Sequence, residues 1–261
     1  MPTLSIITIH RNDFLALQHT QASIQGCLKA GDVEWIVVDG ASDWSAQQPQ
    51  LKDVQAQATI FISEPDGGIF DAMNKGLAQA SGRFCFFLNA GDLLLLDDVT
   101  ALLHQPACAQ ADVLLFAAQE GLRPACARVK KTRSLSALWY GMPTHHQAVL
   151  FSTDACRRAG GYDTRYQLAA DYALLCRLWR DGARGLCLES TLCHFDLHGV
   201  SSRNHRLGLD EEHAVRANIL KINPVFNRLI YATKCSIRII RKSLPRLYGW
   251  LRYRPAAVIK F

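Results

Sequence analysis

The chain has 261 residues, of which 49% are hydrophobic and 20% charged, so it has enough apolar side chains to bury a large core and is not disordered as a whole. Its apolar runs fall well short of the roughly 20 residues that span a membrane, and no leader of basic and then apolar residues precedes the first strand pattern. We therefore exclude a membrane transporter. The net charge is +6, and the nine cysteines form no CxxC pair. Since no export signal is evident, we also exclude a disulfide-stabilised secreted domain and expect a cytoplasmic protein with reduced thiols.

Short apolar segments and helical patterns alternate along the first hundred residues. Strand patterns occupy 4–9, 34–38, 60–63 and 84–88, and helical patterns occupy 14–24 and 69–80. Strands and helices that alternate at this spacing are typical of βαβ units, so we predict an α/β fold whose central sheet is mostly parallel and flanked by helices. In the less regular second half, we expect a strand at 113–118 and a helix at 166–180.

Aspartates follow three of the predicted strands: Asp39, Asp66 and Asp92. Because open α/β sheets bind ligands at the carboxyl ends of their strands, these carboxylates are candidates for one site. Carboxylates gathered at one edge repel each other unless a cation lies between them, and hard oxygen ligands favour Mg²⁺ or Mn²⁺. The chain has no Walker or Rossmann phosphate loop, since Gly67-Gly68 lacks the required spacing. For each aspartate taken singly, a turn-forming or helix-capping role is the alternative.

Several sequence blocks are far more specific than any single aspartate. They are SIIT at 5–8, EWIVVDGASD at 34–43, SEPDGGIFDAMNKG at 63–76, LNAGD at 88–92, His146-Gln147 and Ala170-Asp171-Tyr172. With these blocks the chain resembles family 2 glycosyltransferases of GT-A fold, in particular the small bacterial enzymes of exopolysaccharide, colanic-acid-like and O-antigen assembly. The resemblance covers residues 3–202 and implies an enzyme that inverts the anomeric carbon in a single in-line displacement.

The resemblance implies roles at the metal and at the acceptor. Asp92, the last residue of the family's metal-binding aspartate motif, would bind a Mn²⁺ or Mg²⁺ ion on the donor diphosphate. The motif usually has a further aspartate, whereas Asn89 contributes a neutral carbonyl oxygen at the donor site. His198 is a further candidate metal ligand, for which a surface or core histidine is the alternative. Asp171 matches the catalytic base, for which charge complementarity at a helix N-terminus is the alternative.

The resemblance also implies a nucleotide pocket. Thr8 and Asp39 would line it at the ends of the first two strands, with Asp39 contacting the base or the ribose. Asp66 would lie in the loop over the base, and Lys75 in the segment that lines the donor site. We expect the segment His145-His146-Gln147 at the acceptor site, with an ordinary surface or core position as the alternative.

The chemistry of sugar transfer independently requires two carboxylates with different duties. A sugar hydroxyl is a poor nucleophile, so a carboxylate within hydrogen-bonding reach must take its proton as it attacks. Negative charge builds on the departing nucleoside diphosphate, and a metal ion stabilises that charge without proton transfer. Asp171 fits the first duty and Asp92 the second.

Charge is distributed unevenly along the chain. Residues 213–261 contain eleven Lys or Arg and no Asp or Glu, and apolar residues interleave with them within 228–260. We therefore expect a GT-A domain at 1–212, with a nucleotide-sugar-binding half (1–100) and an acceptor-side half (101–212), followed by a helical, basic and amphipathic extension at 213–261. Such a helix suits an anionic membrane surface, although packing on the catalytic domain or on a second subunit is the alternative. No nucleic-acid recognition motif accompanies the charge.

We therefore expect a metal-dependent inverting glycosyltransferase of cell-surface polysaccharide biosynthesis. Its donor would be a nucleoside diphosphate sugar, with UDP first and GDP or dTDP as alternatives. Its acceptor would be a glycan or a lipid-linked saccharide, met at the cytoplasmic face of the inner membrane. A rival, a nucleotidyltransferase, would need a glycine- and arginine-rich loop after the first strand, where this chain has HRND at 10–13. A second rival, a catalytically inactive tether of a membrane biosynthetic complex, draws its support from Asn89 alone.

Overall fold

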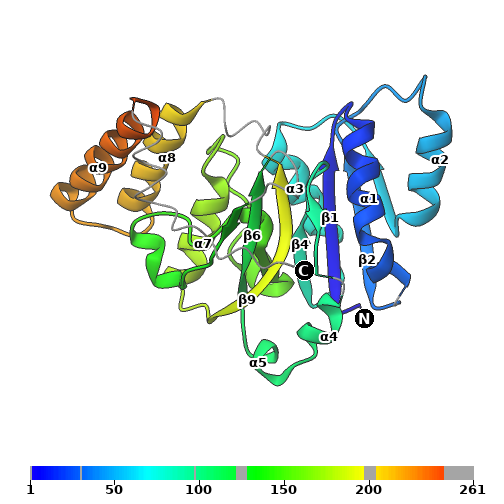
Figure 1. Cartoon of the computed structure of the whole chain (residues 1–261), viewed down its shortest axis with the longest axis horizontal. Coiled ribbons are helices and arrows are strands. Elements are labelled where there is room, and N and C mark those ends of the chain that lie inside the picture. Colours follow the sequence, from blue (N-terminus) through cyan, green and yellow to red (C-terminus); the bar gives the residue numbers. More distant parts are fainter. Residues whose placement is uncertain (1, 30, 97, 122–127, 197–203, 244–261) are drawn as a thin grey trace, which may run out of the picture.

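The computed structural model describes residues 2–29, 31–96, 98–121, 128–196 and 204–243 of the chain. One nine-stranded sheet runs through these residues, and helices cover both of its faces (Figure 1). The strands are β1 (Leu4–His10), β2 (Val33–Asp39), β3 (Ile60–Ser63), β4 (Phe84–Phe87), β5 (Leu93–Leu94), β6 (Val113–Gly121), β7 (Arg128–Lys130), β8 (Val149–Ser152) and β9 (Gly185–Asp196). The strands predicted from the sequence are among them.

The first half of the sheet is parallel and the second half is mixed. Along the sheet the order is β3-β2-β1-β4-β8-β6-β9-β5, with β7 paired to β6. β1 pairs in parallel with β2 and β4, and β2 with β3, so the carboxyl ends of these strands meet at one edge. β8 runs antiparallel to β4 and β6, and β5 antiparallel to β9, whereas β6 and β9 are parallel. The predicted parallel pairing is thus confirmed for the N-terminal half, where helices connect successive strands.

Helices connect the strands and pack on both faces of the sheet. They are α1 (Phe14–Lys29), α2 (Gln48–Gln57), α3 (Ile69–Gln79), α4 (Val99–Leu103), α5 (Pro106–Ala109), α6 (Thr153–Arg158), α7 (Ala170–Arg180), α8 (His205–Asn218) and α9 (Pro224–Ser243), with the 3-10 helices η2 (Leu135–Trp139) and η3 (His146–Ala148). One buried apolar cluster packs α1, α2, α4 and α5 against one face of the sheet. A second cluster packs α3, α6, α7 and η2 against the other face.

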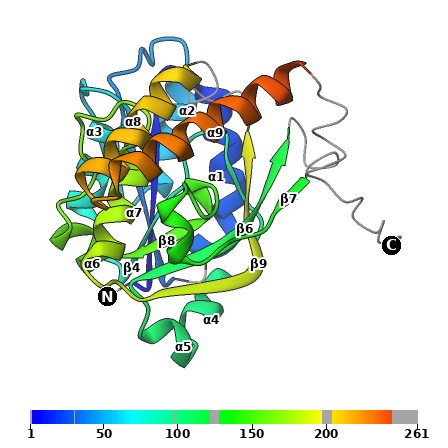
Figure 2. The same cartoon turned by 90° about the vertical axis from the view of Figure 1, so that its left-hand side faces the viewer.

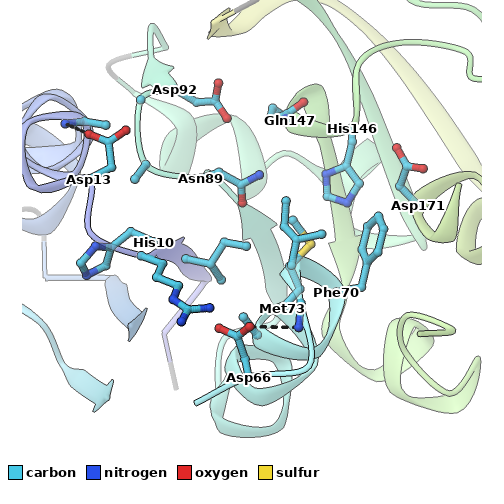
Figure 3. A pocket seen from close by; sticks show the side chains of 18 of the residues that line it. His10, Asp13, Asp66, Phe70, Met73, Asn89, Asp92, His146, Gln147 and Asp171 are labelled. Atoms are coloured by element: carbon cyan, nitrogen blue, oxygen red, sulfur yellow. Dashed lines mark hydrogen bonds between the residues drawn. The ribbon is translucent and has the colours of Figure 1, made fainter. Parts of the chain in front are cut away.

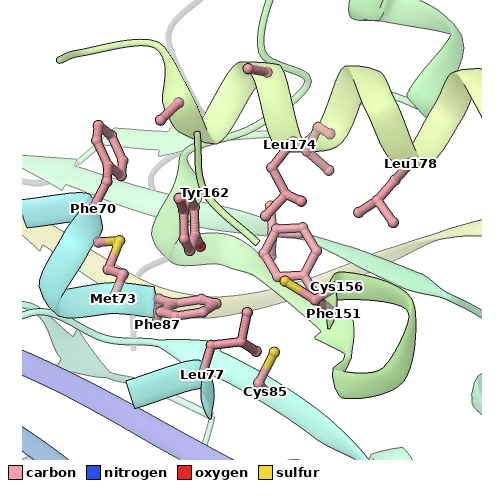
Figure 4. Packing of buried hydrophobic residues seen from close by; sticks show 14 of the residues in the cluster. Phe70, Met73, Leu77, Cys85, Phe87, Phe151, Cys156, Tyr162, Leu174 and Leu178 are labelled. Atoms are coloured by element: carbon pink, nitrogen blue, oxygen red, sulfur yellow. The ribbon is translucent and has the colours of Figure 1, made fainter. Parts of the chain in front are cut away.

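Both faces of the N-terminal strands are buried, which explains their nearly continuous apolar sequence. In β1, Leu4 and Ile6 belong to the first cluster, and Ile7 and Ile9 belong to the second. They alternate because successive side chains of a strand point to opposite faces of the sheet. Figure 4 shows part of the second cluster, which lies between α3 and α7.

Helix α3 approaches the sheet very closely at Gly76. A Cβ atom there would lie 2.4 Å from Cγ2 of Ile7 in β1 and 3.4 Å from Cγ2 of Val38 in β2. Only a residue without a side chain allows this approach, because a Cβ atom at such a distance would overlap its neighbour. The contact fixes α3 against two strands, and with it the position of Gly68 at the beginning of the helix.

Helix α7 begins at Ala170, later than the sequence predicts. The prediction of a helix from residue 166 was therefore wrong for its first turn. Tyr166 donates its N–H to the carbonyl of Asp163 in a turn, and the N–H groups of residues 167–169 donate to the side chain of Glu211. Glu211 lies on α8, 42 to 44 residues after the three residues whose N–H groups it accepts, so no local sequence pattern predicts this contact.

The last two helices, α8 and α9, pack side by side at one end of the molecule (Figure 1, Figure 2). The predicted division at 212/213 falls inside α8, and the extension corresponds to the end of α8 and to α9. Glu212 of α8 binds Lys234 of α9, and Arg216 donates from Nε to Asn227 Oδ1 at 2.8 Å. Residues 244–261 of the extension lie outside the described residues. In the described part of the chain, no helix combines the length and apolar character of a membrane span.

Candidate functional site

A cavity of about 540 Å³ opens at the carboxyl ends of the parallel strands (Figure 3). Its wall is built from the segment after β1, the loop before α3 with the beginning of that helix, the turn after β4, η3 and the segment that leads into α7. Open α/β sheets bind their ligands at this edge. The polar residues that line the cavity are His10, Arg11, Asp13, Asp66, Asn89, Asp92, His146, Gln147, Gln167 and Asp171.

Some of the site residues predicted from the sequence line the cavity, and others do not. Four of the predicted donor, metal and catalytic residues line it: Asp66, Asn89, Asp92 and Asp171. Of the predicted acceptor-side segment, His146 and Gln147 line it, and His145 is not among its lining residues. Three predicted residues are not among its lining residues: Thr8, Asp39 and Lys75. His198 lies outside the described residues. In Figure 3, Asp92 lies at the top of the view and Asp171 at its right, with Gln147 and His146 between them.

The turn 89–92 after β4 is held in place by α1. Gly91 has a φ of 98°, which glycine adopts freely and which lets the chain reverse between Asn89 and Asp92. Thr20, which is fully buried on α1, donates its hydroxyl to the carbonyl of Asp92 at 2.8 Å and accepts the N–H of Gly91 at 3.0 Å. The N–H of Gly91 also donates to the carbonyl of Ala16 at 3.1 Å. Contacts within the protein therefore fix both predicted ligand residues.

Asn89 and Asp92 present oxygen atoms that suit a divalent cation. The Oδ1 atom of Asn89 is buried and makes no hydrogen bond with any described residue, and Asp92 is only 4% exposed. A buried carbonyl oxygen without a partner is costly unless something binds to it. Hard oxygen ligands of this kind favour Mg²⁺ or Mn²⁺, which take further ligands from phosphate and water. Among the residues that the structure describes, no group of three His, Cys, Asp or Glu side chains forms a metal site by itself.

Asp171 lies at the start of α7, partly buried in the cavity wall. Burial raises the pKa of its carboxyl to about 7, and the negative charge of Glu212 adds to the rise. The N–H of Tyr172, which donates to Oδ1 at 2.6 Å, and the charge of Lys130 oppose it. A carboxylate with this pKa accepts a proton readily near neutral pH, so Asp171 has the properties of a general base.

Aromatic rings complete the cavity wall. Phe70 and His146 line the cavity, and Tyr162 and Phe87 stand behind them. His146 Nε2 lies 2.6 Å from the hydroxyl of Tyr162, and burial lowers the pKa of His146 to about 4, so its ring is uncharged at neutral pH. Tyr162 stacks on Phe70 with ring centroids 5.5 Å apart and meets Phe87 edge-on at 5.0 Å. Apolar ring faces beside a few polar groups are typical of small-molecule sites.

Asp39 is fully buried and bonds within the protein. It accepts hydrogen bonds from the hydroxyl and the N–H of Ser42, from Oγ of Ser63 at 2.6 Å and from Nε1 of Trp44 at 3.0 Å. Burial alone would raise the pKa of Asp39, but these hydrogen bonds outweigh burial and hold the pKa below its usual value. The side chain thus fixes the loop after β2, and its expected contact with a base or ribose stays a prediction.

Thr8 and Lys75 also bond to the protein itself. Thr8 is fully buried, and its Oγ1 accepts the indole N–H of Trp35 at 3.0 Å. Lys75 Nζ lies 2.8 Å from Oε1 of Glu64, at the beginning of the loop that carries Asp66. Lys75 therefore braces the loop over one side of the cavity, whereas Thr8 joins β1 to β2.

Four polar residues of the cavity had no role in the sequence analysis: His10, Arg11, Asp13 and Gln167. Arg11 and Asp13 follow the carboxyl end of β1, so their place after a strand is the signal that could have found them. Gln167 offers no such signal, because the sequence assigns it to a helix that in the structure begins after it.

Known proteins of similar sequence match most of the chain, although no family model matches it. An uncharacterised glycosyltransferase of Mycobacterium tuberculosis is 33% identical over 211 residues, which are 77% of this chain and 78% of that protein. A PGL/p-HBAD biosynthesis glycosyltransferase of Mycobacterium bovis is 27% identical over 221 residues, which are 80% of this chain and 77% of that protein.

Solved structures match nearly the whole chain. TarS of S. aureus in complex with UDP superposes with a TM-score of 0.62 at 16% identity, over 98% of this chain and 76% of that one. A mannosyltransferase of Pyrobaculum calidifontis in complex with GDP-Man and Mn²⁺ superposes with a TM-score of 0.58 at 16% identity, over 96% of this chain and 78% of that one. At these identities the likeness shows the fold, and the predicted GT-A-type fold is confirmed.

Proposed function

This chain belongs to the glycosyltransferases, and on that premise we propose that it transfers a sugar from a nucleoside diphosphate donor to an acceptor hydroxyl, with inversion at the anomeric carbon. The observation that carries the proposal is the cavity at the end of the parallel strands. It has Asn89 and Asp92 at one side and Asp171, with a pKa of about 7, at another (Figure 3). Sugar transfer needs oxygen ligands for a cation at the leaving diphosphate and a base at the acceptor.

The donor we propose is a nucleoside diphosphate sugar, with UDP as the first choice and GDP or dTDP as alternatives. Structural neighbours in complex with UDP, UDP-GlcNAc and GDP-Man support this class of ligand. The volume of about 540 Å³ is within the usual range of small-molecule sites. Asp92 and Asn89 would hold Mn²⁺ or Mg²⁺, which when bound neutralises negative charge on the departing diphosphate.

Asp171 is the base of the proposed reaction. The acceptor oxygen forms a bond to the anomeric carbon while its proton moves to a carboxylate oxygen of Asp171. The bond from the anomeric carbon to the diphosphate breaks, and its electron pair stays on the diphosphate. Attack from the face opposite the leaving group inverts the carbon. His146 is neutral at this pH, so it adds no positive charge that would weaken the base.

A thermal-shift screen of UDP, GDP and dTDP, each with Mn²⁺, Mg²⁺ or EDTA, tests the donor site. A ligand at about 100 times its Kd stabilises the fold by about 2.7 kcal/mol, which the screen resolves. We expect one nucleotide to respond, and only with metal, and we expect Asp92→Asn to lose the response. Asp171→Asn should keep the response and transfer no sugar. A folded protein that responds to none of these nucleotides favours the inactive tether.

We propose further that α9 brings the enzyme to an anionic membrane surface, where it meets a glycan or lipid-linked acceptor of cell-surface polysaccharide assembly. α9 lies outermost in the fold (Figure 2) and exposes a set of large apolar residues: Val225, Phe226, Leu229, Ile237, Ile239 and Ile240. Trp139 stacks on Phe226 with centroids 5.5 Å apart and adds an aromatic residue of the kind found at membrane interfaces. Basic residues without acidic ones after residue 212 match the charge of anionic lipids.

Co-sedimentation with vesicles tests this contact. We expect binding to vesicles that contain phosphatidylglycerol, weaker binding at high salt, and little binding to pure phosphatidylcholine. Leu229→Asp should reduce binding, whereas Leu15→Asp on α1 should not, although both leucines are similarly exposed at 61% and 63%. If the two variants bind alike, or if the wild type stays in the supernatant, α9 is not a membrane surface.

A further inference from the structure

Glu211 of α8 accepts three backbone hydrogen bonds from the segment that leads into α7. Its Oε1 atom accepts the N–H of Gln167, and its Oε2 atom accepts those of Leu168 and Ala169, all at 2.8 Å. Ala169 is the N-cap residue of α7, and its methyl side chain cannot cap a helix. The carboxylate of Glu211, from another helix, instead binds the N–H of this N-cap residue and of the two residues before it, where it also meets the partial positive charge of the N-terminus.

The segment held in this way is part of the cavity wall. Gln167 and Leu168 line the cavity, as does Asp171, which follows two residues after the last N–H that Glu211 binds. Glu211 is not among the lining residues. Gly208, one turn earlier on α8, lies beside this wall, where a Cβ atom would make an ordinary van der Waals contact at 3.8 Å from Cδ1 of Leu168.

We propose that Glu211 is a positioning residue for the base Asp171, an inference that rests on the function proposed above. By fixing three successive peptide groups before α7, Glu211 sets the direction in which the first turn of the helix presents Asp171 to the cavity. A glutamine at this place has a single acceptor oxygen and turns its amide N–H groups toward backbone donors. It therefore cannot hold all three peptide groups.

The charges around Asp171 allow this role to be seen in a pH profile. The charges of Glu212 on α8 and Lys130 on β7 act on its carboxyl, and the variants below change neither. If the segment 167–169 loosens, water reaches the carboxyl of Asp171 and its pKa falls toward the ordinary value. The acid limb of the activity profile then moves to lower pH.

Glu211→Gln is the test, and Asp210→Asn is its control. Asp210 is the neighbouring residue on α8, is exposed, and accepts a hydrogen bond from the hydroxyl of Tyr231 at 2.6 Å. For Glu211→Gln we expect kcat to fall about 10- to 100-fold, with the donor KM nearly unchanged and the acid limb shifted to lower pH. Asp210→Asn should stay close to the wild type. A role in folding alone would reduce the amount of folded enzyme and leave the limb where it is.

Amide hydrogen exchange gives a second measurement that needs no sugar transfer. The amides of residues 167–169 should exchange about tenfold faster in Glu211→Gln than in the wild type or in Asp210→Asn. Equal exchange in all three proteins overturns the proposal, as does a Glu211→Gln variant with the kcat and the pH limb of the wild type. A wild type that transfers no sugar refutes the proposed function instead, and the exchange rates then still show whether Glu211 holds the segment.

Discussion

Asn74 and Tyr162 hold each other through two hydrogen bonds: Asn74 Nδ2 donates to the carbonyl of Tyr162, and Asn74 Oδ1 accepts the N–H of Tyr162, both at 2.8 Å. Asn74 lies on α3 within the most specific sequence block, 63–76, and Tyr162 lies 88 residues further along the chain. The pair joins the helix after the Asp66 loop to the aromatic wall of the cavity. It gives a structural reason for an asparagine on this helix.

Asn74→Asp should lower the free energy of unfolding by about 1–3 kcal/mol, because a carboxylate cannot donate to the carbonyl of Tyr162. Gln79→Glu introduces the same charge at an exposed position of the same helix, and we expect it to change this free energy by less than about 0.5 kcal/mol. Urea denaturation measures both variants. Equal effects would show that the reciprocal pair contributes nothing of its own.

Asn89→Asp should strengthen Mn²⁺ binding in the presence of the preferred nucleotide, because a second carboxylate replaces a neutral carbonyl oxygen. We expect the Kd to fall about tenfold, which corresponds to about 1.4 kcal/mol. Asn89→Leu, which is of similar size but has no oxygen ligand, should weaken Mn²⁺ binding by a comparable factor. Calorimetric titration decides the matter, and an affinity that neither substitution moves would exclude Asn89 as a ligand. EDTA should stop transfer, and added Mn²⁺ should restore it.

The pKa of about 7 at Asp171 makes both activity and stability depend on pH. Activity should rise as pH passes through about 7, because only the ionised carboxylate accepts a proton. The folded pKa lies above the ordinary value of 3.8, so ionisation increasingly costs stability as pH rises from about 4 to about 7, and the cost persists above that range. Asp171→Asn should thus be stabilised relative to the wild type at pH 8 but not at pH 4. Thermal unfolding at both pH values checks this, and a difference that is the same at both would contradict the raised pKa.

Gly76→Ala should destabilise the fold by about 1–3 kcal/mol, because its new methyl group would overlap Cγ2 of Ile7. Gly26→Ala is the matched control within another helix, α1. A Cβ atom at Gly26 meets nothing within 4 Å, so alanine should stabilise the helix by about 0.5–1 kcal/mol. The two substitutions are chemically the same and are expected to shift the urea midpoint in opposite directions. A shift in the same direction would mean that α3 can move away from the sheet.

Strand-end position predicts which residues reach the cavity better than it predicts what their side chains do. Asn89 and Asp92, the predicted donor-site and metal-binding residues, both line the cavity, because the turn after β4 follows directly from a buried strand and contains a glycine. Asp39 also ends a strand, yet its carboxyl is directed to Trp44 and Ser63. Those partners come from a loop and a neighbouring strand. Their placement depends on tertiary packing, which no pattern within one segment of the sequence predicts.

The beginning of α7 shows the same limit from the other direction. Helical periodicity continues through residues 166–169, so local sequence favours a longer helix. The carboxylate of Glu211 competes for the N–H groups of residues 167–169 and ends the pattern there. Asp171, the predicted base, still lines the cavity, because it lies near the start of the helix in the structure as in the prediction.

The two walls of the cavity, at Asp92 and at Asp171, are held in different ways. On the side of Asp92, Thr20 and α1 hold the turn in its final shape before any ligand arrives. On the side of Asp171, the three N–H groups of residues 167–169 are held by a single carboxylate that reaches across from another helix. We expect chains with this fold to keep one donor while they diversify their acceptors. Changes in α8 would alter the wall at Asp171 and leave the wall at Asp92 as it was. An engineer who wishes to redirect the acceptor should therefore begin at α8.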